Sequence, residues 1–259
     1  MKEYRKDIVT VKDIAYMMDP SVLKLDTSYE DVYALVDACK KYDFGSCFAW
    51  PAYYPLLSEL LKDTNTAFGT SLSFPSGQEA TSTKVQQAEL FMSMDPAEVD
   101  MVLNVGWLKS KKYDEVLADI KAVREATKGA SLKVIIEAMI LTDDEITKAC
   151  ELCLEAGADY VKSGTGFSEA PTTLHHVKVM KAAIGDKAKL KVAGGVRDLD
   201  TLLVMYKFGA DRFGIGLQSA IKIIEEAIAR GPQIDMAAVS EEEYASRPKD
   251  TNEASKVLY

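Results

Sequence analysis

The stretch LKVIIEAMILTDDEITKACELCLEAGADYVKS, residues 132–163, contains the unit that decides the fold. It begins with β-branched residues that are apolar on both faces, as expected for a parallel strand covered on both sides. Thr142 and the three acidic residues after it are typical of a helix start, and Gly157 is typical of a helix end. A second β-rich run follows at 160–163. Two such runs joined by a helix predict a βαβ unit with parallel strands.

The same alternation of apolar runs and amphipathic stretches occurs eight times between residues 22 and 229. Eight strand–helix units in about 230 residues is the count of a (β/α)8 TIM barrel, for which about 250 residues is typical. We therefore predict an α/β fold, a TIM barrel in a single domain. The predicted strands are Val22–Leu25, Ser46–Trp50, Ala67–Phe74, Val99–Val105, Leu132–Met139, Tyr160–Ser163, Leu190–Ala193 and Arg212–Ile215. The predicted helices are Tyr29–Lys41, Tyr53–Leu61, Thr81–Ser93, Tyr113–Thr127, Asp143–Ala156, Thr172–Ala183, Asp200–Phe208 and Gln218–Ala229.

The periodic pattern ends after the last predicted helix. Gly231 and Pro232 are typical of a helix end, and the sequence that follows them is largely polar and aperiodic. We expect residues 1–232 to form the barrel and residues 233–259 to form a C-terminal tail that packs loosely or moves. No change of composition suggests a linker inside the barrel.

Composition and charge limit the classes of function. The chain has 259 residues, with 31 Lys and Arg against 40 Asp and Glu, and a net charge of −9. Such a chain, without a basic cluster, is not expected to bind nucleic acid or anionic lipid. Its first residues, MKEYRKDIVTVKDI, lack the apolar core of a signal peptide, and we see no apolar run that could span a membrane. Four cysteines suit a reducing, cytoplasmic location, and an acidic barrel could form a homodimer.

Among the charged residues in apolar strand patterns, three stand out: Lys162, Lys191 and Asp100. The active site of a TIM barrel lies at the carboxyl ends of its strands, and the two lysines fall on the sixth and seventh predicted strands. Because neighbouring strands lie about 4.8 Å apart, the two ammonium groups could approach within about 6 Å. Repulsion and burial would then give one lysine a neutral amine, the nucleophile that forms a Schiff base with a carbonyl. Position alone does not say which lysine attacks.

Ordinary ion pairing is the alternative role for these residues. Either lysine alone would be expected to point outward or to pair with an acid such as Asp100 or Glu137. The presence of both, each followed by a glycine-rich turn, favours catalysis. Asp100 is expected either to relay protons and orient a lysine or to serve as a counter-ion. Asp19 is a weaker candidate of the same kind.

Glycine-rich turns follow three of the predicted strands. Their backbone N–H groups could converge on a phosphate, as loops after the last strands of a barrel often do, and Arg197 would add a positive charge. Turns also need glycine for conformational reasons, so each turn alone is weak evidence. The glycines expected at this anion site are Gly166, Gly194, Gly195, Gly214 and Gly216.

No metal and no cofactor are expected. Cys150 and Cys153 form a CxxC pattern inside a predicted helix with no second pair, so packing explains them better than zinc does. His175 and His176 are adjacent on a helix and therefore face different directions, which makes a histidine-based triad a poor interpretation.

At these positions the chain resembles the deoxyribose-phosphate aldolase family, metal-independent barrel enzymes that form a Schiff base. The resemblance covers nearly the whole chain, and its most specific part is the ordered pair of lysine motifs, Val161-Lys162 and Lys191 with the Ala193–Arg197 turn. Further matches are Asp19 with Ser21, Cys47 with Pro51, Ser73–Gly77 with Lys84, Glu98–Asp100, Lys133–Glu137 and Gly157–Asp159.

The resemblance implies an activity and residue roles. The activity is the reversible cleavage of 2-deoxy-D-ribose 5-phosphate, a small sugar phosphate, to acetaldehyde and D-glyceraldehyde 3-phosphate. Lys162 is then the nucleophile, Lys191 lowers its pKa, and Asp100 relays protons. Some family members use a C-terminal tyrosine for proton transfer, and this chain ends in Tyr259. The remaining implied substrate-binding residues are Asp19, Ser21 and Cys47.

The chain departs from the family at the expected phosphate end. Gly216 and Leu217 stand where relatives usually carry two serines, and Phe167 stands where some carry a lysine. Asp19-Pro20-Ser21 replaces an Asp-His-Thr pattern. A charged hydrogen bond is worth about 1.5–3 kcal/mol, so these changes could shift preference toward unphosphorylated or bulkier aldehydes. The alternatives are therefore a Schiff-base aldolase for another hydroxy-aldehyde or keto sugar, and a non-catalytic sugar-binding barrel.

Overall fold

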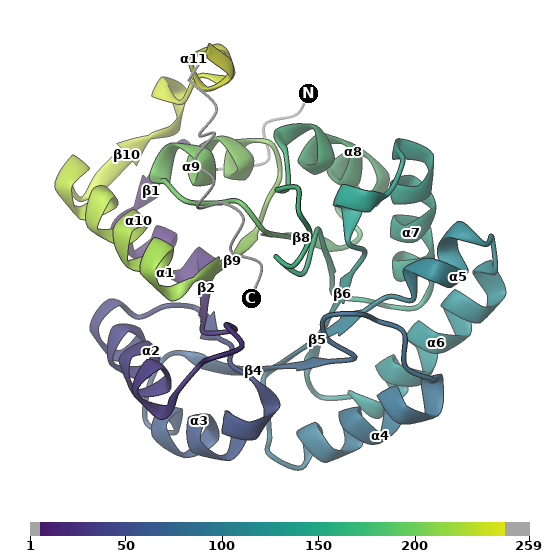
Figure 1. The fold of residues 1–259 in the computed structure, drawn as a ribbon. Helices are drawn as coiled ribbons and strands as arrows, with labels where there is room; N and C mark the ends of the chain where they lie inside the picture. The colour runs from purple at the N-terminus through teal and green to yellow at the C-terminus, as the bar shows by residue number, and fades with distance from the viewer. Residues whose placement is uncertain (1–5, 247–259) are drawn as a thin grey trace.

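The computed structural model describes residues 6–246, in which helices surround a ring of eight parallel strands (Figure 1). Hydrogen-bonded neighbours follow the order β2-β9-β8-β7-β6-β5-β4-β3. The ring closes between its ends, where the Phe48 N–H donates to the Pro20 carbonyl at 3.1 Å. The predicted TIM barrel is confirmed. Its strands are β2 (Met18–Ser21), β3 (Ser46–Cys47), β4 (Ala67–Leu72), β5 (Glu98–Val102), β6 (Ser131–Ile135), β7 (Tyr160–Lys162), β8 (Lys189–Ala193) and β9 (Arg212–Gly216).

Helices connect consecutive strands on the outside of the ring, and local sequence sets their ends. The Thr142 hydroxyl accepts from the Glu145 N–H while the Glu145 carboxylate accepts from the Thr142 N–H, a capping box at the start of α7. The eight predicted helices are present with small shifts of their ends, and α5 is additional. The helices are α2 (Tyr29–Tyr42), α3 (Tyr54–Leu61), α4 (Thr81–Met92), α5 (Val105–Lys109), α6 (Tyr113–Ala126), α7 (Asp143–Glu155), α8 (Leu174–Ile184), α9 (Leu199–Lys207) and α10 (Leu217–Arg230).

The prediction for the first barrel strand is wrong. Residues 22–25 form a loop, and the strand is β2, with the sequence Met-Asp-Pro-Ser. Proline and aspartate are rare in strands because proline has no N–H to donate and aspartate is costly to bury. Here Pro20 needs only its carbonyl to bond Phe48, and Asp19 pairs with Arg212 inside the barrel. Tertiary contacts therefore override the local preference.

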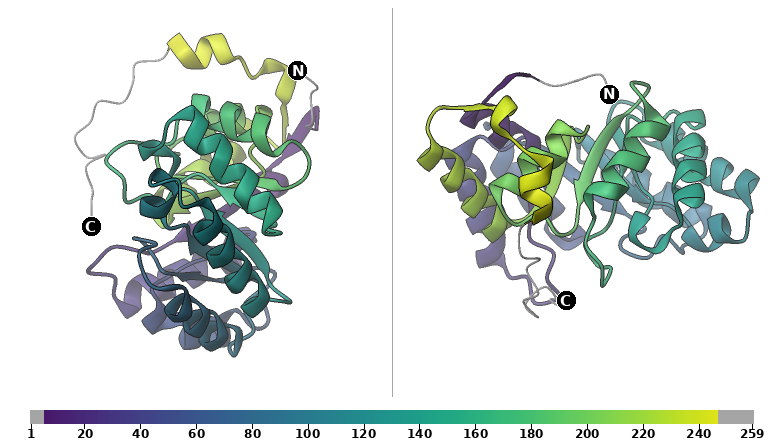
Figure 2. Two further views of the ribbon diagram at one scale, coloured as in Figure 1. Left: turned by 90° about the vertical axis from the view of Figure 1, so that its right-hand side faces the viewer. Right: turned by 90° about the horizontal axis from the view of Figure 1, so that it is seen from above.

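Two segments outside the predicted alternation pair with each other. β1 (Ile8–Thr10) and β10 (Gln233–Asp235) form a two-stranded antiparallel sheet beside the barrel (Figure 2). α1 (Val11–Met17) follows β1, and α11 (Glu241–Ser246) follows β10 after the buried Met236. The first part of the predicted tail therefore contains regular structure, and apart from the buried Met236 its described residues are half-buried or exposed. Residues 247–259, which include Tyr259, lie outside the described residues, and the boundary at residue 232 stays a prediction.

Buried charges occupy the middle of the barrel, where branched apolar side chains ordinarily pack. Side chains of a strand alternate between the two faces, and Glu98 and Asp100 take alternate positions on β5. The sheet register places Asp100 beside Lys133 and Lys162 beside Lys191 on adjacent strands. None of the helices in residues 6–246 is both long and apolar enough to cross a membrane.

Candidate active site

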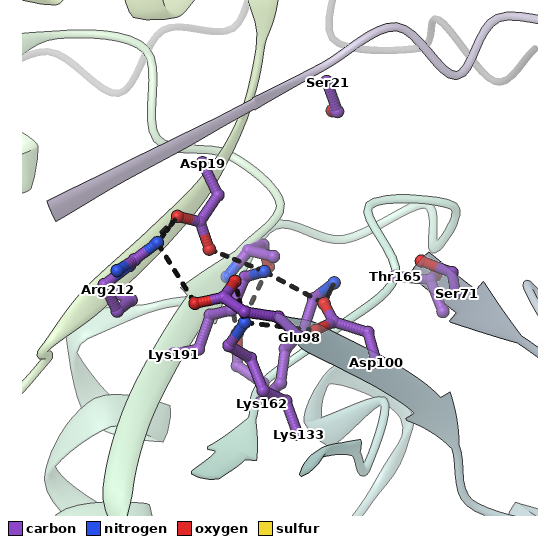
Figure 3. A network of polar contacts seen from close by, with 12 residues as sticks. Asp19, Ser21, Ser71, Glu98, Asp100, Lys133, Lys162, Thr165, Lys191 and Arg212 are labelled. Carbon is purple, nitrogen blue, oxygen red and sulfur yellow. Dashed lines mark hydrogen bonds and ion pairs between the residues drawn. The ribbon is translucent and has the colours of Figure 1, made fainter. Parts of the chain in front are cut away.

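Seven charged side chains from six strands form one network inside the barrel (Figure 3). All seven are buried. An unpaired buried charge costs several kcal/mol, so each needs partners of opposite sign. The network contains the carboxylates of Asp19, Glu98 and Asp100 and the cationic groups of Lys133, Lys162, Lys191 and Arg212.

Asp100 lies at the centre of this network. Its Oδ2 accepts hydrogen bonds from Nζ of Lys162 at 2.7 Å and from Nζ of Lys191 at 2.9 Å. Its Oδ1 lies 3.5 Å from Nζ of Lys133. Burial alone would raise the pKa of Asp100, but the three lysines, Lys162 first among them, hold it well below its usual value. Asp100 is therefore ionised, and a single one of its oxygen atoms accepts hydrogen bonds from both predicted lysines.

A second carboxylate distinguishes the two lysines. Asp19 Oδ2 lies 2.8 Å from Nζ of Lys191, while Asp19 Oδ1 accepts a hydrogen bond from Nε of Arg212 at 2.9 Å. The Lys191 ammonium also lies 4.1 Å from the centre of the Phe48 ring, a cation–π contact. Lys191 thus pairs with two carboxylates. In the part of the chain that the structure describes, Lys162 forms an ion pair with Asp100 alone.

The two lysines consequently hold their protons with different strength. Burial lowers the pKa of Lys162 to about 8, and the charge of Lys191 acts in the same direction against that of Asp100. Burial also disfavours the charged form of Lys191, but Asp100 and Asp19 raise the pKa of Lys191 above its usual value. An amine with a pKa of about 8 is neutral in roughly a tenth of molecules at pH 7. Lys162 is thus suited to attack a carbonyl, and Lys191 is a lasting cation beside it.

The charge count of the network leads to the same assignment. Among residues 6–246 it holds four basic groups against three acidic ones, and a buried net charge is unfavourable. Loss of one proton makes the network neutral. Lys133, Lys191 and Arg212 each bridge two carboxylates, so Lys162 is the group that gives up its proton most easily.

A cavity of about 450 Å³ opens over the lysines, among the loops at the carboxyl ends of the strands. Asp100 lies beneath it, in contact with both lysines. The structure brings most of the predicted site residues to this cavity. Those that line it are Asp19, Ser21, Lys162, Gly166, Lys191, Gly194, Gly195, Arg197, Gly214 and Gly216.

One part of the cavity wall is suited to an anion. α10 begins there, and its cap residue Gly216 offers no side chain to the first N–H groups of the helix. Such N–H groups and the helix dipole attract negative charge. Gly194 and Gly195, with φ of +89° and +93°, form the neighbouring wall together with Arg197. The left-handed backbone at these two positions requires glycine. A glycine-rich sequence therefore looks the same whether the glycines serve the turn or bind an anion.

Two predicted substrate residues are placed differently from the rest. Cys47 is fully buried and does not line the cavity. A hydrogen bond with Cys39, together with burial, raises the pKa of the Cys47 thiol well above its usual value, so this thiol is a packed, neutral group. Gly214 reaches the cavity, and a Cβ at this position would lie 3.1 Å from the Cβ of Ala193 on the neighbouring strand β8, tighter than an ordinary contact. Glycine here relieves the close approach to Ala193.

Three members of the network were not predicted as site residues: Glu98, Lys133 and Arg212. The signal that selected Lys162 is present at two of them, because Lys133 and Arg212 are also charged residues inside apolar strand patterns. Phe48 was missed for another reason. An aromatic residue in a strand is ordinary, so nothing in the sequence marks it as a partner of lysine.

Comparison with known proteins identifies the family. The model of the DeoC/LacD family aldolases matches residues 13–219. The deoxyribose-phosphate aldolase of Carboxydothermus hydrogenoformans is 40% identical over 226 residues, which are 86% of this chain and 98% of that protein. A solved structure from Coccidioides immitis is 33% identical, with a TM-score of 0.82 over 88% of this chain and 90% of that one. The chain belongs to the DeoC/LacD family of aldolases and is a carbon–carbon lyase.

A further solved structure bears on assembly. The deoxyribose phosphate aldolase of Aeropyrum pernix is 25% identical, with a TM-score of 0.78 over 85% of this chain and 93% of that one, and is described as tetrameric. The predicted family is confirmed by the family model and the relatives above. The predicted homodimer stays a prediction.

The Lys133→Met variant is expected to need a higher pH for activity. Lys133 repels the charged form of Lys162, so its removal raises the pKa of Lys162. The acid limb of the pH profile of kcat/KM should therefore move upward by about one pH unit. Lys133→Arg keeps the charge and should leave the limb in place.

Lys84→Met is the matched control for this experiment. Lys84 is also fully buried, and its Nζ pairs with Asp119 at 2.6 Å, between α4 and α6. Its removal should destabilise the fold to a similar degree, by about 3–5 kcal/mol, without moving the pH profile. A limb that stays in place in Lys133→Met, or moves equally in Lys84→Met, would contradict the electrostatic role of Lys133.

Proposed function

We propose that this chain catalyses the reversible cleavage of 2-deoxy-D-ribose 5-phosphate to acetaldehyde and D-glyceraldehyde 3-phosphate through a Schiff base on Lys162. One observation carries the proposal. The Lys162 amine, with its lowered pKa, contacts the buried Asp100 carboxylate and faces a cavity with one wall suited to an anion. The substrate is proposed from the name of the relative from Carboxydothermus hydrogenoformans.

The first half of the reaction forms the imine. The neutral amine of Lys162 adds to the carbonyl carbon of the open-chain sugar, and the hydroxyl group that results leaves as water. Asp100 touches both lysine nitrogens, so it passes protons between them and is ionised again after each transfer. The Lys191 ammonium supplies the proton for the departing water and regains one in the second half. The product is a protonated imine on Lys162, with a positive nitrogen that attracts electrons.

The second half breaks the carbon–carbon bond. The hydroxyl group on the third carbon gives its proton to the Lys191 amine, which donated its own in the first half; the bond between the second and third carbons breaks, and its electrons pass to the imine nitrogen. Glyceraldehyde 3-phosphate leaves, and the enamine of acetaldehyde remains on Lys162. Protonation of the enamine carbon and addition of water release acetaldehyde and restore the amine. Tyr259 lies outside the described residues, and its part in this protonation stays a prediction.

Trapping with borohydride tests the covalent step. Acetaldehyde and borohydride should leave an ethyl group on Lys162, detected by mass spectrometry of peptides. The absence of an adduct at Lys162 would favour the alternative, a non-catalytic sugar-binding barrel. Cleavage of deoxyribose at a rate equal to that of its 5-phosphate would favour an unphosphorylated substrate instead.

The Arg197→Ala variant tests the phosphate end. We expect KM for deoxyribose 5-phosphate to rise about tenfold or more, the worth of a charged hydrogen bond, while kcat changes little. Acetaldehyde trapping on Lys162 should be unchanged, because acetaldehyde carries no phosphate. Arg230→Ala, at the far end of α10 in an ion pair with Asp200 at 2.6 Å, is the control. An equal effect of both variants on KM would show that Arg197 does not contact the phosphate.

Two remaining expectations are proposals as well. The four cysteines are buried and free, which supports a reducing, cytoplasmic location. A homodimer remains our expectation for the assembly, and a sedimentation experiment at micromolar concentration distinguishes it from a tetramer or a monomer.

A further inference from the structure

Three aromatic rings form a cluster at the mouth of the barrel. The Phe167 ring lies 5.9 Å from that of Trp50 and 5.0 Å from that of Phe74, both edge to face, and Trp50 and Phe74 lie 6.0 Å apart. Edge-to-face pairs at these separations attract one another. The three rings therefore hold one another in place, and we call them the aromatic bridge.

The aromatic bridge spans the mouth from one side to the other. Phe167 is in the loop after β7, whereas Trp50 follows β3 and Phe74 follows β4. In the closed order of the ring, three strands lie between β7 and β3 in either direction, so β7 and β3 lie opposite each other. Contact across that distance requires the loop after β7 to reach over the barrel. The bridge therefore covers part of the opening above the catalytic network.

Phe167 is also part of the cavity wall. It lines the same cavity as Lys162, together with Val22 and Leu23 from the loop after β2. Trp50 fixes that loop, because its Nε1–H donates to the Lys24 carbonyl at 2.9 Å. These apolar side chains are only partly buried, so their exposed faces meet whatever occupies the cavity. The cavity thus has an apolar wall in addition to its anion-binding wall.

We propose that the apolar wall of Phe167, Val22 and Leu23, backed by the aromatic bridge, is a second acceptor subsite that takes unphosphorylated aldehydes with an apolar chain. This proposal rests on the proposed Schiff-base chemistry of Lys162 and extends the range of aldehydes that can accept acetaldehyde. Such an aldehyde gains free energy by burying its chain against these side chains.

The reaction at this subsite needs no further reactant. The enamine of acetaldehyde on Lys162 supplies an electron pair that forms a bond to the carbonyl carbon of the apolar aldehyde. The carbonyl oxygen of that aldehyde takes up a proton and becomes a hydroxyl group. Water then hydrolyses the imine, which releases a 3-hydroxy-aldehyde and restores the amine of Lys162.

The experiment compares 3-phenylpropanal, glyceraldehyde and glyceraldehyde 3-phosphate as acceptors for acetaldehyde. With the unmodified chain, we expect kcat/KM for 3-phenylpropanal to exceed that for glyceraldehyde by about tenfold or more. Phe167→Ala should lower kcat/KM for 3-phenylpropanal about tenfold and leave the values for the other two acceptors within about threefold. Phe167→Lys should lower the value for 3-phenylpropanal similarly and raise that for glyceraldehyde 3-phosphate.

Phe208→Ala is the matched control, because Phe208 is a partly buried ring that lies 4.3 Å from the Lys178 ammonium, outside the cavity. It should change none of the three values. A 3-phenylpropanal value no higher than that of glyceraldehyde, or an equal loss for all acceptors in Phe167→Ala, would overturn the subsite. Acetaldehyde trapping on Lys162 is measured in parallel: a missing adduct defeats the Schiff base itself, whereas an adduct without apolar preference defeats only the subsite.

Discussion

The Lys162→Met variant loses aldolase activity by about 10⁴-fold or more, the scale expected when a covalent nucleophile is removed. No adduct forms with acetaldehyde and borohydride, because no amine remains at this position. Activity at both pH 7 and pH 9 should be lost, since a higher pH cannot replace the missing nitrogen. The measurement is the rate of deoxyribose 5-phosphate cleavage together with mass spectrometry of the trapped protein.

The same variant should remain as stable as the unmodified chain. The network holds four cations against three carboxylates, so removal of Lys162 leaves equal numbers, and Asp100 keeps Lys191 and Lys133 as partners. We expect the free energy of unfolding in urea to change by less than about 1 kcal/mol. Lys191→Met is the comparison, because it removes the cation that lies 2.8 Å from the buried Asp19 Oδ2 and should destabilise the fold by about 3–5 kcal/mol. Full activity in Lys162→Met, or unfolding of it alone, would refute the assignment.

The Asp100→Asn variant is expected to have a lower maximal rate and an acid limb of the pH profile that lies at lower pH. Its maximal rate falls by about 10²–10⁴-fold, because no carboxylate carries protons between the two lysines. The pKa of Lys162 falls at the same time, since Asp100 is the charge that raises it. The acid limb of the pH profile therefore moves to lower pH although the enzyme is slower. A pH titration of kcat/KM from pH 5 to 9 measures both.

Asp119→Asn serves as the control for this second variant. Asp119 is a buried acid paired with Lys84, so its loss should cost stability to a similar degree and leave the pH profile unchanged. If Asp100→Asn lowered the rate without moving the acid limb, Asp100 would act through packing only. An upward movement of the limb would contradict the geometry, because it would mean that a lost negative charge had favoured a cation.

Much of the barrel could be predicted because its signals are local. The run at 132–136, the cap at Thr142 and the helix end at Gly157 lie within one unit, and each depends on its immediate neighbours. The first strand could not be predicted in the same way. Pro20 and Asp19 belong to a strand only because β9 and the Phe48 backbone supply their partners.

The residues of the candidate site likewise divide into those with a local signal in the sequence and those without one. Lys162, Lys191 and Asp100 could be found because a charge inside an apolar strand is a visible anomaly. Lys133 and Arg212 carry the same anomaly but were not predicted as site residues; Lys133 precedes no glycine-rich turn, whereas Arg212 precedes Gly214 and Gly216 and could have been found by the same signal. Phe167 was noticed as a departure from the family pattern, but the contacts of the aromatic bridge had no signal, because its three rings come from loops after three different strands.

The sequence by itself determined the eightfold alternation of strands and helices and the presence of two lysines on adjacent strands, because both depend on spacing along the chain. The resemblance to the family implies that Lys162 is the nucleophile, and only the tertiary structure supplies a physical reason for that assignment. Asp100 is 62 residues from Lys162 and 91 residues from Lys191 in the sequence, yet its carboxylate contacts both amines and affects the pKa of each. Asp19 adds a second carboxylate beside Lys191 alone. Coulomb forces act through space, and the folded barrel sets those distances.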